Sequence, residues 1–167
     1  MWLFLFLAWW LEFNAGELEV KEISGEPVAT LRGTVELRLD SLKMQGDWGR
    51  VWSYDSIAVL EENVRIEDSL VVVYCSTFTY RHSTGLALCV GDVSAEGDLG
   101  VVYCDTLRYE LDEEHAEVWG NFWGRVTAGG VEVWGDRGEI EVASRDGRVF
   151  GPFVFMRGKQ GTLVLRG

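Results

Sequence analysis

The chain has 167 residues, which suits a single domain with a substantial core and leaves little room for two. Apolar residues make up 47% of it and only two residues are proline, so the composition argues against a disordered chain. The net charge of −12 comes without a basic face, which argues against nucleic acid as a partner because phosphate binding needs clustered Lys and Arg.

The first element in chain order is an apolar run from Trp2 to Leu11. A membrane-spanning helix needs about 20 apolar residues, and this shorter run is typical of the central region of a secretory signal peptide. No Lys or Arg precedes it, and Phe13-Asn14-Ala15 is a poor cleavage site, so a short membrane anchor and an ordinary buried segment stay open as alternatives. We predict a signal peptide or short membrane anchor at residues 1–16 and one domain at residues 17–167.

From about residue 30 the chain repeats itself with a period of 29 residues, lengthened once to 31. Val73–Val93 matches Val102–Phe122 at seven of 21 positions. A step of one small or polar, one polar and one apolar residue recurs at Gly33-Thr34-Val35, Glu62-Asn63-Val64, Gly91-Asp92-Val93, Gly120-Asn121-Phe122 and Gly151-Pro152-Phe153. A second step has the same spacing: Gly46-Asp47, Cys75-Ser76, Cys104-Asp105 and Gly135-Asp136. One insertion explains the longer period in both series, which indicates structural repeats at about 31–62, 63–91, 92–120 and 121–155.

Within each unit apolar and polar residues alternate with period two, which predicts strands with one buried face. The phase of the alternation shifts by one at each small residue, as it does at a bend or β-bulge. Turn residues such as Ser83-Thr84-Gly85 close both ends of each unit, so we expect two antiparallel strands per unit, each bent once. The predicted corner residues are Gly46, Asp47, Cys75, Gly91, Cys104, Asp105, Gly120, Asn121, Gly135, Asp136 and Gly151.

Consecutive strands that bend at the same height form an all-β sheet folded along its length, with two facing halves joined by the bends. Apolar residues of matching parity face the inside in every unit, which predicts a long apolar trough across all of the repeats. The predicted trough residues are Val51, Leu60, Val64, Ile66, Phe78, Tyr80, Val93, Leu107, Tyr109, Val118, Phe122 and Ile140.

The side chains that most often carry chemistry are few. The three cysteines read as small buried hydrophobic residues, and whether any two of them are bonded stays open. His82 and His115 lie in or near turns without metal-ligand spacing, and no nucleophile elbow, P-loop or H-E-x-x-H motif is present. We therefore predict no metal, no cofactor and no enzymatic activity.

Aromatic residues gather around the fourth corner, where they are either core or a rim that touches lipid or a membrane surface: Trp119, Phe122, Trp123 and Trp134.

The repeated unit resembles the OstA/LptA/LptC family of lipopolysaccharide-transport proteins over roughly residues 30–155. The residues that carry the resemblance are Val102, Cys104-Asp105, Leu107, Tyr109, Ala116, Val118 and Gly120-Asn121-Phe122, with Phe78, Tyr80 and Gly91-Asp92-Val93 in the preceding unit. Two units depart from the pattern: the first has Gly46, Asp47 and Gly49 where aromatic residues or leucine are expected and Glu62 at the corner glycine, and the last has Pro152, which cannot donate to a sheet. These departures weaken both ends as interfaces of the family type.

The resemblance implies an open β-jellyroll, or β-taco, in the periplasm that binds lipopolysaccharide or a related lipid by its acyl chains. It implies partners of two kinds, other OstA-like export components or a second copy, paired through the sheet edges. It leaves open an LptA-like soluble bridge or an LptC-like component anchored in the inner membrane. Outside the family, the alternative is a structural or adhesive envelope protein with a dry core.

Overall fold

The computed structural model describes residues 10–141, 144, 146–151, 153–158 and 161–166. In this part of the chain 13 strands form one antiparallel sheet, which confirms the predicted all-β class. The strands are β1 (Glu12–Asn14), β2 (Glu17–Ile23), β3 (Glu26–Leu39), β4 (Leu42–Trp52), β5 (Ile57–Glu67), β6 (Val71–Arg81), β7 (Leu86–Gly97), β8 (Gly100–Glu110), β9 (His115–Val126), β10 (Val131–Glu141), β11 (Asp146–Phe150), β12 (Phe153–Gly158) and β13 (Gly161–Arg166). Two short 3-10 turns, η2 (His82–Thr84) and η3 (Ala128–Gly130), lie in hairpin connections.

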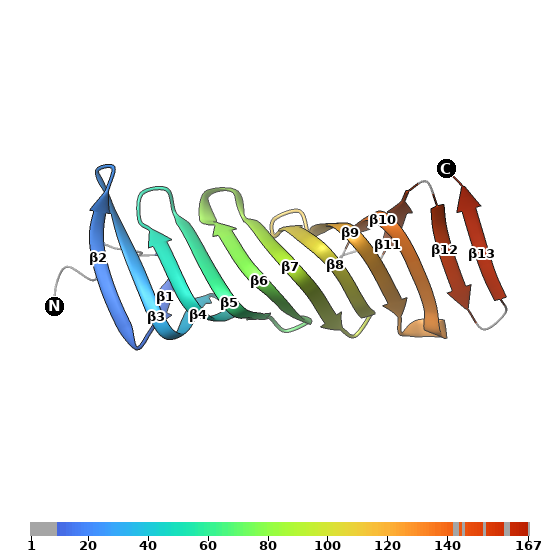
Figure 1. Ribbon diagram of the computed structural model, residues 1–167, viewed down its shortest axis with the longest axis horizontal. Helices are drawn as coiled ribbons and strands as arrows, with labels where there is room; N and C mark the ends of the chain where they lie inside the picture. The colour runs from blue at the N-terminus through green and yellow to red at the C-terminus, as the bar shows by residue number, and fades with distance from the viewer. Residues whose placement is uncertain (1–9, 142–143, 145, 152, 159–160, 167) are drawn as a thin grey trace.

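Strands that follow one another in sequence are neighbours in the sheet from β3 to β10, so this part is a meander of hairpins (Figure 1). At the N-terminal end β1 and β2 both pair with β3, and together they act as one bent strand. At the C-terminal end β11 and β12 share β10 in the same way, and β13 extends the sheet beyond β12. The predicted order of bent antiparallel strands is therefore confirmed.

One crease crosses the sheet. Every pairing from β3–β4 to β9–β10 contains one register shift. In four strands two consecutive residues at the shift have left-handed φ angles: Gly33-Thr34, Glu62-Asn63, Gly91-Asp92 and Gly120-Asn121. Opposite each of these pairs, the neighbouring strand has a single residue. Two residues against one is the geometry of a β-bulge. The two predicted series of corners thus alternate along the same crease.

The residue types at the crease follow from this geometry. Glycine and asparagine tolerate a left-handed φ better than other residues do. Asn121 donates from Nδ2 to Asp105 Oδ2 at 2.9 Å, and Asn63 makes the same bond to Asp47 at 2.5 Å. In these two bulges an aspartate on the adjacent strand therefore holds the asparagine from the outer side. Glu62 adopts a left-handed φ of 63°, although it lacks the conformational freedom of glycine.

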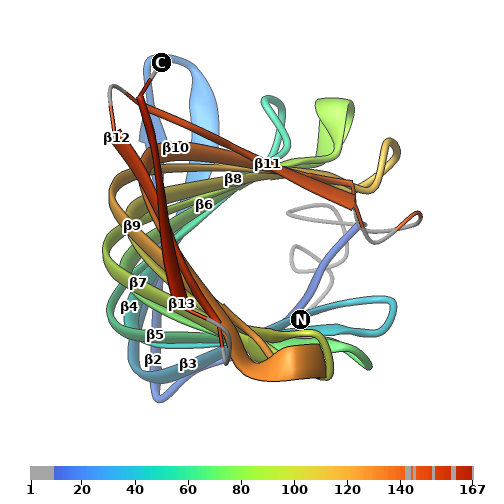
Figure 2. The ribbon, with the colours of Figure 1, turned by 90° about the vertical axis from the view of Figure 1, so that its right-hand side faces the viewer.

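The bends curl the sheet into an open C in cross-section (Figure 2). Hairpin turns lie along both rims of the open side, and we call these rims the lips. The first lip carries the turns at 53–56, 82–85 and 111–114. The second lip carries the turns at 40–41, 68–70, 98–99 and 127–130.

Residues before position 17 also belong to the packed fold. Trp10 and Leu11 are each only 6% exposed and join the core, and β1 pairs with residues 36–38 of β3. Residues 10–14 thus take part in the packing, and the division of the chain into residues 1–16 and 17–167 stays a prediction. Residues 1–9, which contain most of the apolar run, lie outside the described residues. Among those described, no helix is both long enough and apolar enough to cross a membrane.

Candidate functional site

The inner face of the C is the candidate site, and the predicted trough residues all lie on strands that build it. Nine of them are buried: Val51, Leu60, Val64, Ile66, Phe78, Tyr80, Val93, Val118 and Phe122. The other three, Leu107, Tyr109 and Ile140, are half-buried and lie on β8 and β10. Burial of the inner face is therefore graded: the interior is closed over β3 to β7 and partly open over β8 to β10.

Two rows of cross-strand partners explain how the inner face packs between the crease and the first lip. The first row is Ala29, Val51, Ala58, Tyr80, Ala87, Tyr109, Ala116 and Ile140. The second row is Leu31, Gly49, Leu60, Phe78, Cys89, Leu107, Val118 and Gly138. In the first row alanines flank both tyrosines, and in the second row Cys89 lies on one side of Phe78, so each ring has room over at least one small neighbour. Cys89, between Phe78 and Leu107, serves as one of these small residues.

At the N-terminal half of the open side, Trp10 covers the mouth of the C. Its indole stacks on the His82 ring at 5.0 Å between centroids and lies 6.2 Å from the Tyr80 ring. Tyr80 comes from the inner face and His82 from the first lip, so one aromatic group caps both. This contact was not foreseen from the sequence, because the segment reads as a signal.

Acidic side chains from both lips surround the mouth. Burial raises the pKa of Tyr80, and the nearby carboxylates of Asp112 and Asp40 raise it further. Burial likewise raises the pKa of Tyr109, with Glu114 and Asp68 adding to the effect. Each inward tyrosine thus senses one carboxylate from each lip. The trough is apolar inside and negative at its opening.

The cysteines are placed as packing residues. Cys75, Cys89 and Cys104 are buried free thiols in the described structure. A hydrogen bond with Cys75 and burial raise the pKa of Cys89, and burial raises the pKa of Cys104 to about 12. A reactive cysteine needs a thiolate at neutral pH, so the environment of Cys89 and Cys104 disfavours nucleophilic chemistry.

Histidine chemistry is also limited. His115 Nδ1 lies 2.7 Å from Glu141 Oε1, and this hydrogen bond raises the pKa of His115. His82 lies under Trp10. Among the residues that the structure describes, no group of three or more His, Cys, Asp or Glu side chains is placed to hold a metal ion.

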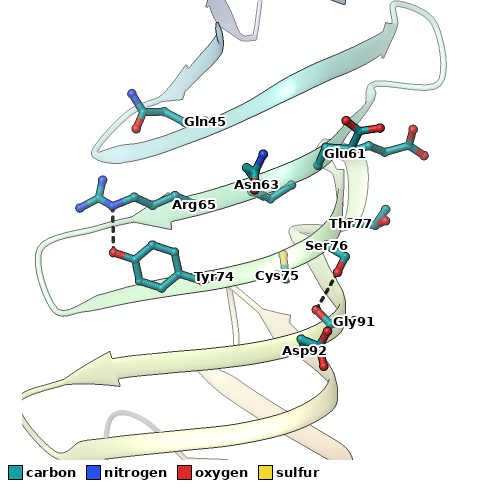
Figure 3. Close-up of a pocket in the computed structure, with 12 residues that line it drawn as sticks. Gln45, Glu61, Asn63, Arg65, Tyr74, Cys75, Ser76, Thr77, Gly91 and Asp92 are labelled. Atoms are coloured by element: carbon teal, nitrogen blue, oxygen red, sulfur yellow. Dashed lines mark hydrogen bonds between the residues drawn. The ribbon is translucent and has the colours of Figure 1, made fainter.

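A polar hollow of about 1000 Å³ lies on the outer surface at the crease, away from the inner face (Figure 3). Glu61, Asn63 and Arg65 of β5 line one side, and Tyr74 and Ser76 of β6 line the other. Arg65 Nε donates to Tyr74 Oη at 3.4 Å, and Ser76 Oγ donates to the Gly91 carbonyl at 3.2 Å. Its walls are charged and open to water, so it does not suit an acyl chain.

A single antiparallel sheet creased along its length, with one continuous apolar inner face, defines the β-taco class of protein. The chain is similar to a solved structure of this class, LptH of Pseudomonas aeruginosa, described as the LptA-homologous periplasmic component of a lipopolysaccharide transport device. The two share 13% sequence identity at a TM-score of 0.61, over 75% of this chain and 94% of that chain. This likeness shows the fold. No protein-family model matches the sequence, and no curated protein sequence matches it.

Proposed function

We propose that the protein is a non-enzymatic lipid carrier of the LptA-like kind, which holds acyl chains of lipopolysaccharide or a related lipid on the inner face. The observation that carries the proposal is the graded burial of that face. Leu107, Tyr109 and Ile140 continue the apolar rows of the closed half but are only half-buried, so apolar surface is left to cover. A soluble protein leaves such surface uncovered mainly where it meets a ligand or partner.

The chemistry of the inner face suits a cargo that moves. Each buried methylene contributes about 0.8 kcal/mol, so several acyl chains together hold a lipid firmly. The contact is non-directional, and a chain can therefore slide along the rows without breaking specific bonds. Trp10 and Leu11 are apolar side chains that pack at the open side, where we propose that acyl chains lie, so this place accommodates apolar groups.

The proposed partners follow from the sheet edges. Within the described residues β2 pairs only with β3, β11 pairs only with β10, and β13 pairs only with β12. Such edges are templates for another strand. We propose that they pair with other OstA-like export components or with a second copy, in the periplasm. Whether residues 1–16 are cleaved or anchor the chain in the inner membrane separates an LptA-like from an LptC-like role.

The test compares two neighbouring substitutions on β8. Leu107 faces inward, and Thr106 beside it faces outward on the same strand. We expect Leu107→Asp to weaken binding of purified lipopolysaccharide about tenfold or more, because a carboxylate opposes burial of acyl chains. Thr106→Asp is expected to bind as the unchanged protein does. Displacement of an apolar fluorescent probe by lipopolysaccharide measures both, and equal affinities would remove the support for the trough.

A second candidate is a structural envelope protein with a dry core, and the closed packing over β3 to β7 favours it. Leu31, Leu60 and Phe78 are at most 1% exposed, which leaves no lipid volume at that end. If the unchanged protein binds no lipopolysaccharide yet forms polymers that edge-strand prolines disrupt, the structural function is the right one.

A further inference from the structure

The outer face of the C-terminal half carries a row of aromatic side chains. Cross-strand pairing places Tyr103 beside Trp123, Trp123 beside Trp134, and Trp134 beside Phe155. The four residues come from β8, β9, β10 and β12, and alternation along each strand turns them away from the trough. We call them the aromatic row. Tyr103 and Phe155 are 44% and 41% exposed, and the ring of Tyr103 stacks on that of Trp123 at 5.1 Å.

A second row on the same face, two residues nearer the second lip along each strand, is charged. Arg125 and Arg157 flank Glu132 on the adjacent strands. Both guanidinium groups contact its carboxylate, at 2.6 and 2.8 Å, and Arg125 chiefly lowers the pKa of Glu132. The same arginines lie over Trp123 and Trp134, at 5.3 and 5.9 Å from the ring centroids. Two cations and one anion thus lie beside the aromatic row.

Charge along the chain sets this region apart. Residues 121–167 contain seven Arg or Lys and five Asp or Glu, a net charge of +2, whereas residues 1–120 have a net charge of −14. The same line of cross-strand partners continues over the earlier strands as Ser94, Tyr74, Arg65, Gln45 and Glu36, so Tyr74 is the one aromatic residue among these five. Glu96 of β7 is the acidic side chain that borders the patch in the charged row.

We propose that the aromatic row and its two arginines are a docking face for an anionic phospholipid bilayer surface. Tryptophan and tyrosine favour the boundary between lipid headgroups and acyl chains, and arginine binds the phosphates above it. Because the four rings are cross-strand neighbours, they lie at one height and reach one plane together. Two arginines against one glutamate leave a net positive charge, which complements anionic headgroups. The acidic residues 1–120 are held away from those headgroups.

A bilayer fits these observations better than a protein partner does. The face is a sheet surface of rings and guanidinium groups, and the hollow around Asn63 and Ser76 and the smaller one around Glu17 and Thr30 lie on other strands. A peptide or helix docks into a groove, whereas a bilayer surface needs none. The exposed Leu99, at the tip of the hairpin between β7 and β8, adds an apolar group beside the row at the second lip.

The experiment uses the full chain and vesicles of phosphatidylethanolamine and phosphatidylglycerol whose acyl chains are brominated near the headgroup. The apolar N-terminal run can itself enter lipid and carries Trp2, Trp9 and Trp10, so the readout is the difference in bromine quenching between the test variant and the control variant. The test variant is Trp123→Gln with Trp134→Gln. The matched control is Trp48→Gln, which removes a tryptophan that also lies under an arginine, Arg50 at 4.3 Å, on the acidic part of the sheet.

We expect quenching in the unchanged protein and in the control, and loss of most of it in the double variant, with vesicle affinity lower by about tenfold. Added salt is expected to weaken the binding. Tyr103→Ser with Phe155→Ser removes the most exposed rings at little risk to folding, and is expected to lower affinity in the same direction.

Equal quenching in the double variant and in the control would overturn the proposal. It would also be overturned if vesicles left the fluorescence of the unchanged protein untouched while the aromatic row mediated self-association in sedimentation. The trough does not take part in this face, so lipopolysaccharide binding by the Trp123→Gln, Trp134→Gln variant is expected to stay unchanged.

Discussion

Phe78 shows how single residues set the fit of the interior. Its ring is 1% exposed and lies between Leu60 and Cys89 in the second cross-strand row. A smaller residue on one side lets the ring pack without displacing the strands. The thiol of Cys89 therefore has the role of a small apolar group, as the repeat suggested for the cysteines at the corners.

Replacing Phe78 with Ala is expected to destabilise the protein by about 3–5 kcal/mol, because it empties a closed part of the core. Phe155→Ala removes a ring that is 41% exposed and is expected to cost less than about 1 kcal/mol. Denaturant unfolding of both variants measures the difference. Similar costs would mean that the interior over β6 is not tightly packed.

His115 and Glu141 form a titrating pair on the outer face, near the first lip. The folded-state pKa of His115 lies above its ordinary value of 6.5, chiefly through its hydrogen bond to Glu141. The stabilisation is therefore fully present below the unfolded pKa and is lost as the pH rises through the folded one.

We expect His115→Gln to cost more free energy of unfolding at about pH 5 than at about pH 8, by less than about 1 kcal/mol because the pair is partly exposed. The imidazole titration followed by NMR checks the cause: Glu141→Gln should lower the pKa of His115. A pKa that did not move would assign the shift to another group.

At the scale of elements, the crease is what turns a flat meander into a trough. Its position was predictable from the sequence, because small and polar residues recur at Gly91-Asp92 and Gly120-Asn121 where the hydrophobic phase shifts. The cross-strand rows were not fully predictable. They depend on register, and a bulge shifts register by an amount that composition does not show.

Gly120→Ala tests the crease. The glycine has a φ of 73°, and a Cβ there would overlap the carboxylate of Asp105, which already binds Asn121. We expect a loss of about 2 kcal/mol or more in the free energy of unfolding.

The control is Gly25→Ala, since Gly25 has a similar φ of 84° with nothing within 4 Å of the added Cβ. It is expected to cost about 1 kcal/mol from backbone strain alone. If the two variants lost the same stability, contact with Asp105 would contribute nothing to the bend.

At the scale of the whole molecule, the mouth combines an apolar interior with acidic lips. The turns on the two lips contain seven Asp or Glu and no Lys or Arg. An anionic headgroup is repelled there, so the acyl chains are expected to enter while the headgroup stays outside or is bridged by cations.

Binding of lipopolysaccharide is therefore expected to strengthen when Mg²⁺ or salt is added, because both screen the lips. Titration calorimetry with and without Mg²⁺ measures this. Replacing Asp112, Glu113 and Glu114 by their amides should reduce the dependence. Weaker binding in added salt would point to a basic headgroup site instead.

Two large-scale features lay beyond the sequence for different reasons. Trp10 covers the mouth through a contact with residues more than 60 positions away, and no local pattern encodes such a contact. Trp123 and Trp134 of the aromatic row belonged to the cluster predicted from the sequence, but the composition of that cluster suits core and surface equally. Only the strand phase assigns Phe122 inward and Trp123 outward.

Photocrosslinking along β8 tests the central claim most directly. A benzophenone side chain is placed in turn at positions 106, 107, 108 and 109, and the protein is irradiated with lipopolysaccharide. The account predicts labelling at 107 and 109, which face the trough, and little at 106 and 108, which face outward. Equal labelling at all four positions, or labelling only at 106 and 108, would contradict a lipid site on the inner face.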